Sequence, residues 1–482
     1  MMLGGSVWLK SDWALGRRYQ KGHTVLWSLA AVLSILISIA AFFTEYPYLA
    51  VIPSAGLVLL ILAIERPQVI LYTIIFLIPF GRFRSLGGPL KEIQIHWILA
   101  AALLAVLMIR LIVDRNFIRR FQSNILLWIF LFIVISLLSS VFTKFPNTSI
   151  EQIVLNVIAI VFIILVIAFA DRDSVMSHIP LLIAISVSIG AFLAVIGNAF
   201  EISMFVQEVG DSFARSYGAT TDANSLALSI IVALPFVIFL IIHGRSPWIR
   251  FIAILMLLTN LGGIVVTFSR SGGLVTAALL MSALFLNRKR FKVRHTGIFF
   301  AGACIVLLGL AVTVPESYWE RQATLGSSEK DRSLSRRSAY VIVAYDAFLQ
   351  RPILGHGPGT YRDIYAQSRF AILYQRGDES LRRYAHNTYL EVIVGTGIVG
   401  SLVFGMLLLA TLRNFFRARR YFAAIKDSVH TEELNYYILS FCFMLLYLMM
   451  YSDVFQKFLL VAIGWSQVWV RVAKDDKDHS RN

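Results

Sequence analysis

Residues 150–170 read IEQIVLNVIAIVFIILVIAFA and contain one charged side chain, that of Glu151. A transmembrane helix needs roughly 20 apolar residues to cross about 30 Å of hydrocarbon, so this stretch is long enough to span a bilayer. Similar stretches recur along the chain, at roughly 24–43, 48–64, 68–81, 94–113, 124–143, 178–199, 223–243, 247–267, 272–287, 296–314, 386–412, 434–453 and 456–471. The sequence therefore predicts an all-α, polytopic helical membrane protein.

The composition of the whole chain agrees with this fold class. Of 482 residues, 58% are apolar and only 15% are charged, and the mean hydropathy is +0.73. Soluble domains have about 45–50% apolar and about 25% charged residues. We expect about 14 transmembrane helices, or about 12 if the short second and third stretches form one broken hairpin. A disulfide-stapled secreted fold, a disordered chain and a soluble nucleic-acid binder are excluded.

The distribution of Lys and Arg predicts how the chain is oriented. With the N-terminus inside and each residue assigned to its nearer membrane side, 26 of the 44 Lys and Arg lie inside and 18 outside. Eleven of the outer ones fall in one long connection, residues 315–385, and long loops cross a membrane largely regardless of charge. We therefore expect both termini in the cytoplasm. The basic runs at 288–294 and 413–420 are topology anchors that also contact membrane lipids.

The apolar stretches divide the chain into five parts. We expect N-terminal transmembrane helices at 1–199, a transmembrane core at 200–314, a large extracytoplasmic loop subdomain at 315–385, C-terminal transmembrane helices at 386–472 and a cytoplasmic tail at 473–482.

The loop subdomain has its own helix and turn signals. Ser333 to Gln350 has the apolar spacing of an amphipathic helix, and Pro352 then ends it. Its apolar positions are Tyr340, Val343, Ala344, Ala347 and Phe348. A turn-forming run, Gly355-His356-Gly357-Pro358-Gly359, follows. This run lacks the Lys-Ser/Thr ending of a phosphate loop, so nucleotide binding there is not expected.

Three of the nine histidines fall on the outer side, and they are His96, His356 and His386. His386 stands where the loop subdomain meets the next helix, and Asn387 beside it could orient the imidazole ring. Glu391 lies about one and a half turns inside that helix, where it either orients the site or pairs with a neighbour. Small residues follow, with the spacing of close helix packing: Gly395, Gly397, Gly400, Ser401 and Gly405.

Two arginines belong to short outer connections. Arg270 lies in Thr267-Phe268-Ser269-Arg270-Ser271-Gly272-Gly273, and Arg215 precedes Asp222 and Asn224, where Asp222 can cap the following helix. Taken alone, each arginine has an interfacial snorkelling role as its simpler explanation. Together, two guanidinium groups can bind phosphate oxygens bidentately, and a neutral imidazole can accept a proton. This set suits transfer from a lipid diphosphate to a hydroxyl acceptor.

These residues carry a family resemblance. His386-Asn387, nine residues, Gly397, two residues and Gly400 match the pattern His-[Asn/Ser/Gln]-x9-Gly-x-x-[Gly/Thr/Tyr] of O-antigen ligases. Residues 200–410 as a whole resemble the wider O-antigen ligase and polymerase superfamily, through the Arg-x-x-Gly-x5-Asn run at 215–224, Ser-Arg-Ser-Gly at 269–272 and Pro-Ile-Leu-Gly-His-Gly at 352–357. The chain has Tyr340 where family members often carry Trp.

The resemblance implies a glycosyltransferase of the bacterial inner membrane that works at the periplasmic face. Its donor would be a glycan on undecaprenyl diphosphate, and its acceptor a lipid-linked or glycan hydroxyl. Arg215 and Arg270 would hold the diphosphate, His386 would be the catalytic base, and Asn387, Glu391 and Asn224 would support them.

The reaction would need no metal and no cofactor, since no Asp/Glu cluster is evident on that face. An O-antigen ligase with lipid A-core as acceptor is the first expectation, and a Wzy-type exopolysaccharide polymerase is the alternative. A polysaccharide or lipid transporter would instead show charged or broken helices at mid-membrane and repeated halves.

Overall fold

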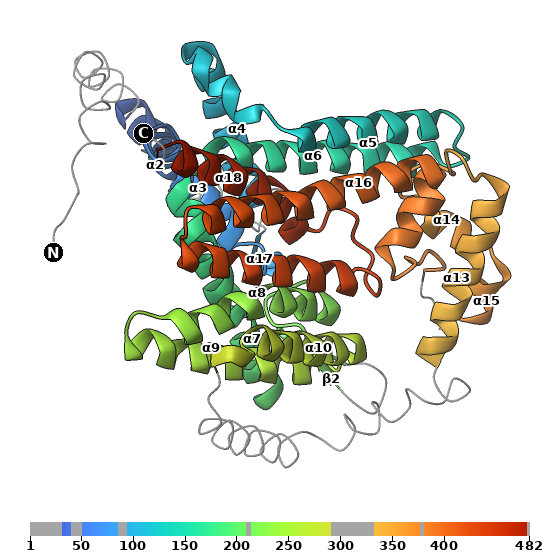
Figure 1. The fold of residues 1–482 in the computed structure, drawn as a ribbon. Helices are drawn as coiled ribbons and strands as arrows, with labels where there is room; N and C mark the ends of the chain where they lie inside the picture. The colour runs from blue at the N-terminus through green and yellow to red at the C-terminus, as the bar shows by residue number, and fades with distance from the viewer. Residues whose placement is uncertain are drawn as a thin grey trace.

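A computed structural model describes residues 31–39, 51–84, 94–208, 214–290, 332–375 and 380–479. The elements within these ranges are almost all helical (Figure 1). The helices are α2 (Val51–Glu65), α3 (Pro67–Phe76), η2 (Gly81–Arg84), α4 (Ile95–Val113), η4 (Arg115–Phe121), α5 (Asn124–Val141), α6 (Pro146–Phe169), η5 (Ser174–His178), α7 (Ile179–Ala199), α8 (Ala223–His243), α9 (Pro247–Val266), α10 (Arg270–Leu286), η6 (Arg288–Arg290), α13 (Arg332–Gln350), α14 (Tyr361–Ala366), α15 (Arg369–Leu373), α16 (Thr388–Ala424), α17 (Ser428–Tyr447) and α18 (Lys457–His479). One antiparallel hairpin joins α7 to α8, with strand β1 (Val206–Glu208) paired to β2 (Ala214–Ser216).

Seven of the described helices are long and apolar enough to cross a membrane: α4, α5, α6, η5 with α7, α8, α9 and α16. The predicted all-α polytopic membrane fold is confirmed. The short second and third apolar stretches correspond to α2 and α3, which are bent against each other by 114° at a short break and could form one further span. The stretch at 296–314 and most of 24–43 lie outside the described residues, so the predicted number of spans stays a prediction.

Short polar residues and prolines set where the spans begin. The side chains of Ser123 and Ser246 accept hydrogen bonds from backbone N–H groups in the first turns of α5 and α9. Pro146 and Pro247 occupy the first positions of α6 and α9, where a helix has no use for the missing N–H. The spans therefore begin where the sequence provides caps.

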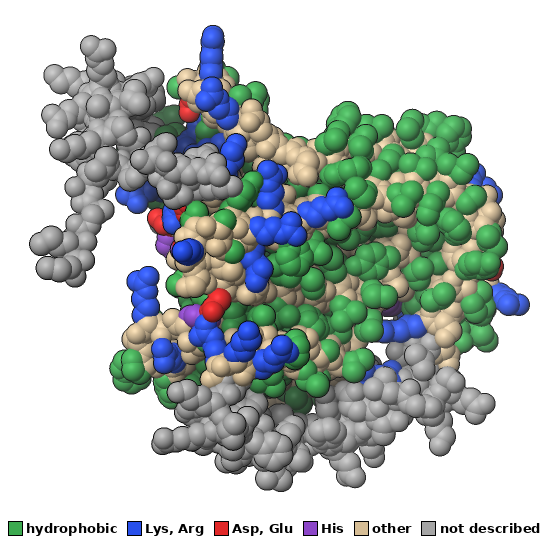
Figure 2. All heavy atoms as spheres, in the orientation of Figure 1, with side chains coloured by type: hydrophobic (Ala, Val, Ile, Leu, Met, Phe, Trp, Pro, Cys, Tyr) green, Lys and Arg blue, Asp and Glu red, His purple; other side chains and the backbone are tan. Residues whose placement is uncertain are grey.

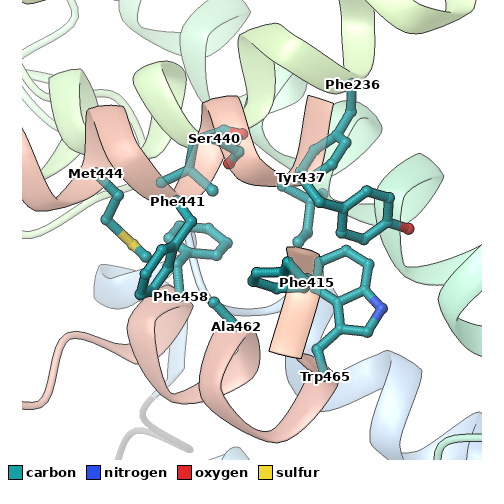
Figure 3. A pocket seen from close by; sticks show the side chains of 11 residues that line it. Phe236, Phe415, Tyr437, Ser440, Phe441, Met444, Phe458, Ala462 and Trp465 are labelled. Carbon is teal, nitrogen blue, oxygen red and sulfur yellow. Dashed lines mark hydrogen bonds between the residues drawn. The ribbon is translucent and has the colours of Figure 1, made fainter. Parts of the chain in front are cut away.

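Helix α16 lies at the centre of the C-terminal half, against α5, α17 and α18, and α8 lies against α7, α9 and α17. Large buried aromatic side chains fill this core, among them Trp469, Tyr437 and Phe422. Figure 3 shows a small cavity there, lined mostly by apolar and aromatic side chains. The hydroxyl of Ser440 at its edge donates to the carbonyl of Val232 at 2.8 Å. This cavity is an apolar packing gap in the middle of the bundle.

The loop subdomain lies across one end of the bundle, as α13, α14 and α15 (Figure 1). Helix α13 covers the predicted Ser333–Gln350 helix and ends before Pro352, as expected. Of its predicted inward positions, Tyr340, Val343, Ala344 and Ala347 are buried, and Phe348 is half-buried. At the other end of the chain, α18 continues through His479, so the predicted boundary at residue 473 falls inside a helix.

Helix α16 is broken at Gly397, which has φ of 64° and ψ of −164°. The segment after α13, residues 352–357, docks at this break and makes backbone hydrogen bonds on both sides of Gly397. The N–H groups of His356 and Gly357 donate to the carbonyls of Val394 and Gly395, each at 2.9 Å. The N–H groups of Ile398 and Val399 donate to the carbonyls of Pro352 and Ile353 at 2.8 and 3.3 Å.

The interpretation of these glycines as small residues for helix–helix packing is therefore wrong for Gly397. Its backbone conformation is one that only glycine adopts readily, and a Cβ atom there would fall on the carbonyl oxygen of Ile353. A Cβ on Gly405 would meet open space. Gly397, Ser401 and Gly405 recur every four residues but do not share one role. Gly397 breaks the helix, whereas Gly405 has open space beside it.

We predict that Gly397→Ala lowers the free energy of unfolding by about 1–3 kcal/mol through backbone strain, and by more once the docked segment is displaced. Gly405→Ala is the matched control and should be neutral or stabilising by about 0.5–1 kcal/mol, because Ala favours a helix interior. Thermal unfolding of both purified variants in detergent measures this difference. Equal stability of the two variants would contradict the role of the break.

Basic side chains gather at the opposite end of the bundle from the loop subdomain. Arg413, Arg417 and Arg420 near the end of α16, and residues 288–290 after α10, are exposed there. Figure 2 shows Lys and Arg over this end and apolar side chains along the flanks of the helices. The charge distribution predicts that this end is the cytoplasmic one, and this orientation stays a prediction.

We predict that a cysteine at Tyr345, whose side chain is 61% exposed on α13, reacts with a membrane-impermeant maleimide added from outside. A cysteine at Arg417 should react only after permeabilisation. Both are introduced after the native Cys304 and Cys442 have been replaced by Ser. The reverse labelling pattern would show that the orientation is inverted.

Candidate active site at the outer end of the bundle

Arg215 lies in strand β2 and reaches the turn that carries Arg270. Its Nε donates to the backbone carbonyl of Thr267 at 2.9 Å, and its Nη2 to Oδ1 of Asn224 at 3.3 Å. Thr267 closes α9, and Arg270 is the first residue of α10. The predicted short connection between two apolar helices is thus present, and Arg215 is bonded to it.

Asn224 joins the two arginine motifs. Its Oδ1 also accepts a hydrogen bond from Oγ of Ser269 at 3.1 Å, and Ser269 caps α10 by accepting from the N–H of Gly272. Asn224 itself is held by Asp222, which caps α8 as the sequence predicted. One amide oxygen therefore links the 215–224 motif to the 269–272 motif.

Positive charge is concentrated around these groups. The charges of Arg337 and Arg270 both act on Arg215, together with the opposing carboxylate of Asp222. Arg337 belongs to α13 of the loop subdomain. The site therefore has guanidinium groups from three separate parts of the chain.

His386 precedes the N-terminus of α16 with a left-handed backbone conformation, φ 50°. Asn387 follows as the N-cap, and its Oδ1 accepts hydrogen bonds from the N–H groups of Tyr389 and Leu390 at 3.0 and 3.2 Å. The side-chain oxygen of Asn387 is thus used to start the helix. The ring of Tyr340 lies beside the imidazole, with the two centroids 5.7 Å apart.

Desolvation by the surrounding protein and, next, the positive charge of Arg337 lower the pKa of His386 to about 4. Arg336 and Arg383 act in the same direction, while Asp222 opposes them. The side chain still keeps contact with solvent. The imidazole is consequently neutral at pH 7 and able to accept a proton.

The connection between α17 and α18 braces the two halves of the site. Tyr447 donates from its hydroxyl to the carbonyl of Asn224 at 3.2 Å, and Tyr451 donates to Oδ2 of Asp222 at 3.2 Å. The backbone N–H of Thr388 at the start of α16 contacts the carbonyl of Tyr451 at 3.0 Å. Asp222 and Asn224 beside the arginines, and Thr388 beside His386, are therefore bonded to the same short segment, residues 447–453.

Comparison with known families bears on this arrangement. Residues 255–405 match the family model described as O-Antigen ligase. This part of the chain is similar to the O-antigen ligase family. No curated protein matches the chain.

The matched residues begin within α9 and end within α16, so they include Arg270, the loop subdomain and His386. The resemblance to the O-antigen ligase-like superfamily is confirmed, and with it the coarse class, a family of multi-pass membrane glycosyltransferases that includes ligases and polymerases. Arg215, Asn224 and the segment 447–453 lie outside the matched residues but contact them directly.

Several residues of this site are not predicted as site residues by the sequence. Arg337 and Tyr340 fall in the predicted amphipathic helix, and Tyr447, Tyr451 and Ser452 fall in the apolar stretch that ends at 453. The polar run Tyr451-Ser452-Asp453 was the available signal, because polar residues at the end of a span are candidates for the interface.

His356 has a structural environment. Its side chain is 7% exposed, and its Nε2 lies 2.8 Å from the carbonyl oxygen of Ala347. Since a carbonyl only accepts, Nε2 carries the proton and donates. Its ring ties the docked segment to α13. Within the described ranges, no group of three or more His, Cys, Asp or Glu has a metal-binding arrangement.

We predict that the imidazole of His386 titrates near pH 4, so that protonation sets in only as the pH falls through that value. Arg337→Gln removes a positive charge and should raise the pKa of His386. Arg417→Gln, at the other end of the bundle, should leave it unchanged. Histidine-selective ¹³C NMR in detergent micelles, assigned with His386→Gln, measures the shift. A pKa of His386 near 6.5 that Arg337→Gln does not change would contradict the electrostatic description.

Proposed function

We propose that the chain is an O-antigen-ligase-type glycosyltransferase of the bacterial inner membrane. It transfers a glycan from undecaprenyl diphosphate to a hydroxyl of lipid A-core at the periplasmic face. The observation that carries the proposal is the convergence of three separate motifs at one end of the bundle. Asn224 joins Arg215 to the Ser269-Arg270 turn. The segment 447–453 bonds both to Asn224 and to Asn387 and Thr388, the residues that follow His386.

Arg215 and Arg270 are the proposed diphosphate ligands. A guanidinium stays charged at all relevant pH values and matches phosphate oxygens with paired N–H donors. Arg215 is fixed by two hydrogen bonds through Nε and Nη2. It is therefore presented in a defined orientation and does not have to be ordered when donor binds.

His386 is the proposed general base. The acceptor oxygen attacks the anomeric carbon of the donor glycan, and its proton passes to the neutral imidazole. The bond between the anomeric carbon and the phosphate oxygen breaks, and undecaprenyl diphosphate leaves with the bonding electron pair. Arg215 and Arg270 stabilise the negative charge that develops on this leaving group. The proposal requires no metal and no cofactor, because cationic side chains meet that charge.

The polymerase alternative uses the same chemistry with another glycan as acceptor. An assay with two acceptors separates the alternatives, since a ligase transfers to lipid A-core and a polymerase extends the lipid-linked glycan.

We predict that His386→Ala lowers kcat by about 10²–10⁴-fold while donor binding persists, because a general base contributes that much. His386→Gln should not restore the rate, and His356→Ala should be much milder. Arg215→Lys and Arg270→Lys keep the charge but lose the planar fork, so both should lose most activity at normal expression. The measurement is transfer of labelled glycan from purified lipid-linked donor.

The same assay is run with EDTA. Activity should survive the chelator. Near-wild-type turnover of His386→Ala, or abolition by EDTA that a divalent cation restores, would overturn the mechanism. Full activity of both Lys variants would reduce the arginines to interfacial anchors.

A further inference from the structure

We infer that Glu391 and Ser452 form a clamp on the backbone around His386 and act as positioning residues for it. This inference rests on the proposed function only in taking His386 as the general base. Glu391 comes from α16 and Ser452 from the α17–α18 connection, so the clamp joins two elements that are distant in sequence.

The two side chains hold the peptide on both sides of His386. Oε1 of Glu391 accepts a hydrogen bond from the N–H of Ala385 at 2.7 Å. Oγ of Ser452 accepts from the N–H of Asn387 at 3.0 Å and donates to the same Oε1 at 3.1 Å. The residue before His386 and the residue after it are thus tied to one connected pair.

His386 needs such support because of its backbone conformation. A non-glycine residue with positive φ carries strain, and it persists where the surrounding structure fixes it. Here φ is 50°. If the two hydrogen bonds were lost, the peptide would relax toward ordinary backbone angles and the ring would move away from the donor site.

The arrangement differs from ordinary helix capping. In a capping box, a carboxylate in the first turn reaches back to the N–H of the N-cap residue. In this chain the N–H of the N-cap residue Asn387 is taken by Ser452, and Glu391 reaches two residues farther back, to Ala385. Glu391 and Ser452 therefore make hydrogen bonds that the capping of α16 alone would not need.

The clamp is also connected to the arginine side. Tyr451, adjacent to Ser452, donates to Asp222, and Tyr447 donates to the backbone of Asn224. Glu391 is 7% exposed, so water does not compete freely for its hydrogen bonds. A single segment thus sets the position of His386 relative to the residues that bind the diphosphate.

The test compares four variants of the full-length chain. Glu391→Met and Ser452→Ala remove the acceptors, whereas Glu391→Gln and Ser452→Thr keep an oxygen in place. Ser282→Ala is the control, because the Ser282 hydroxyl donates to the carbonyl of Ala278 in its own helix and lies outside the candidate site. Hydrogen–deuterium exchange of peptides covering 383–388 is measured beside transfer kinetics.

In Glu391→Met and Ser452→Ala, exchange at the amides of 385 and 387 should rise about tenfold, the usual effect of a lost hydrogen bond. Their kcat should fall by about 10²-fold, the effect of a small misplacement, with KM for donor unchanged. Glu391→Gln, Ser452→Thr and Ser282→Ala should stay close to wild type in both measurements.

Unchanged exchange in Glu391→Met and Ser452→Ala would overturn the clamp. Raised exchange with unchanged kcat would overturn its positioning role. Since the exchange measurement does not depend on glycan transfer, a wild-type chain that transfers nothing would contradict the proposed function while the exchange pattern still decides the clamp. If Glu391→Met fails to fold, Ser452→Ala and the two conservative variants decide the outcome.

Discussion

The break in α16 is the constraint on which the outer end of the molecule depends. A polar backbone group within an apolar bundle must find a partner, and a helix interrupted at Gly397 leaves several without their usual ones. The docked segment 352–357 supplies these partners with its own backbone. Because α13 directly precedes that segment, the same hydrogen bonds hold Arg337 and Tyr340 near His386.

This end of the bundle holds two groups that have opposite requirements for positive charge. The proposed diphosphate site needs concentrated positive charge, and the proposed general base near it must remain unprotonated. The guanidinium groups around His386 serve both needs, because they attract an anion and disfavour the imidazolium form. Asp222 limits this concentration of charge, and it also caps α8 and accepts from Tyr451.

Hydropathy and capping residues were sufficient to predict the fold class, the cap of α8 and the inward face of α13. Capping and helical periodicity depend on residues that are close together in the chain, so a single sequence is enough to recognise them. The break at Gly397 could not be predicted, since a glycine in an apolar stretch has the same letter whether it packs a helix or interrupts one. The candidate site was predicted in part. His386, Arg215, Arg270 and Asn224 came from motifs, whereas Arg337, Tyr340 and the brace depend on contacts between distant segments.

The docking of the loop subdomain through main-chain atoms has a consequence for sequence variation. Main-chain hydrogen bonds do not depend on which side chains the two segments carry. Outside His356 and the glycines that permit the close approach, residues 352–357 can therefore be exchanged while the loop keeps its place. The outward surfaces of α14 and α15 can then vary in sequence. Under the proposed function, a protein of this architecture could accept new glycans while the segments that position its reactive groups stay unchanged.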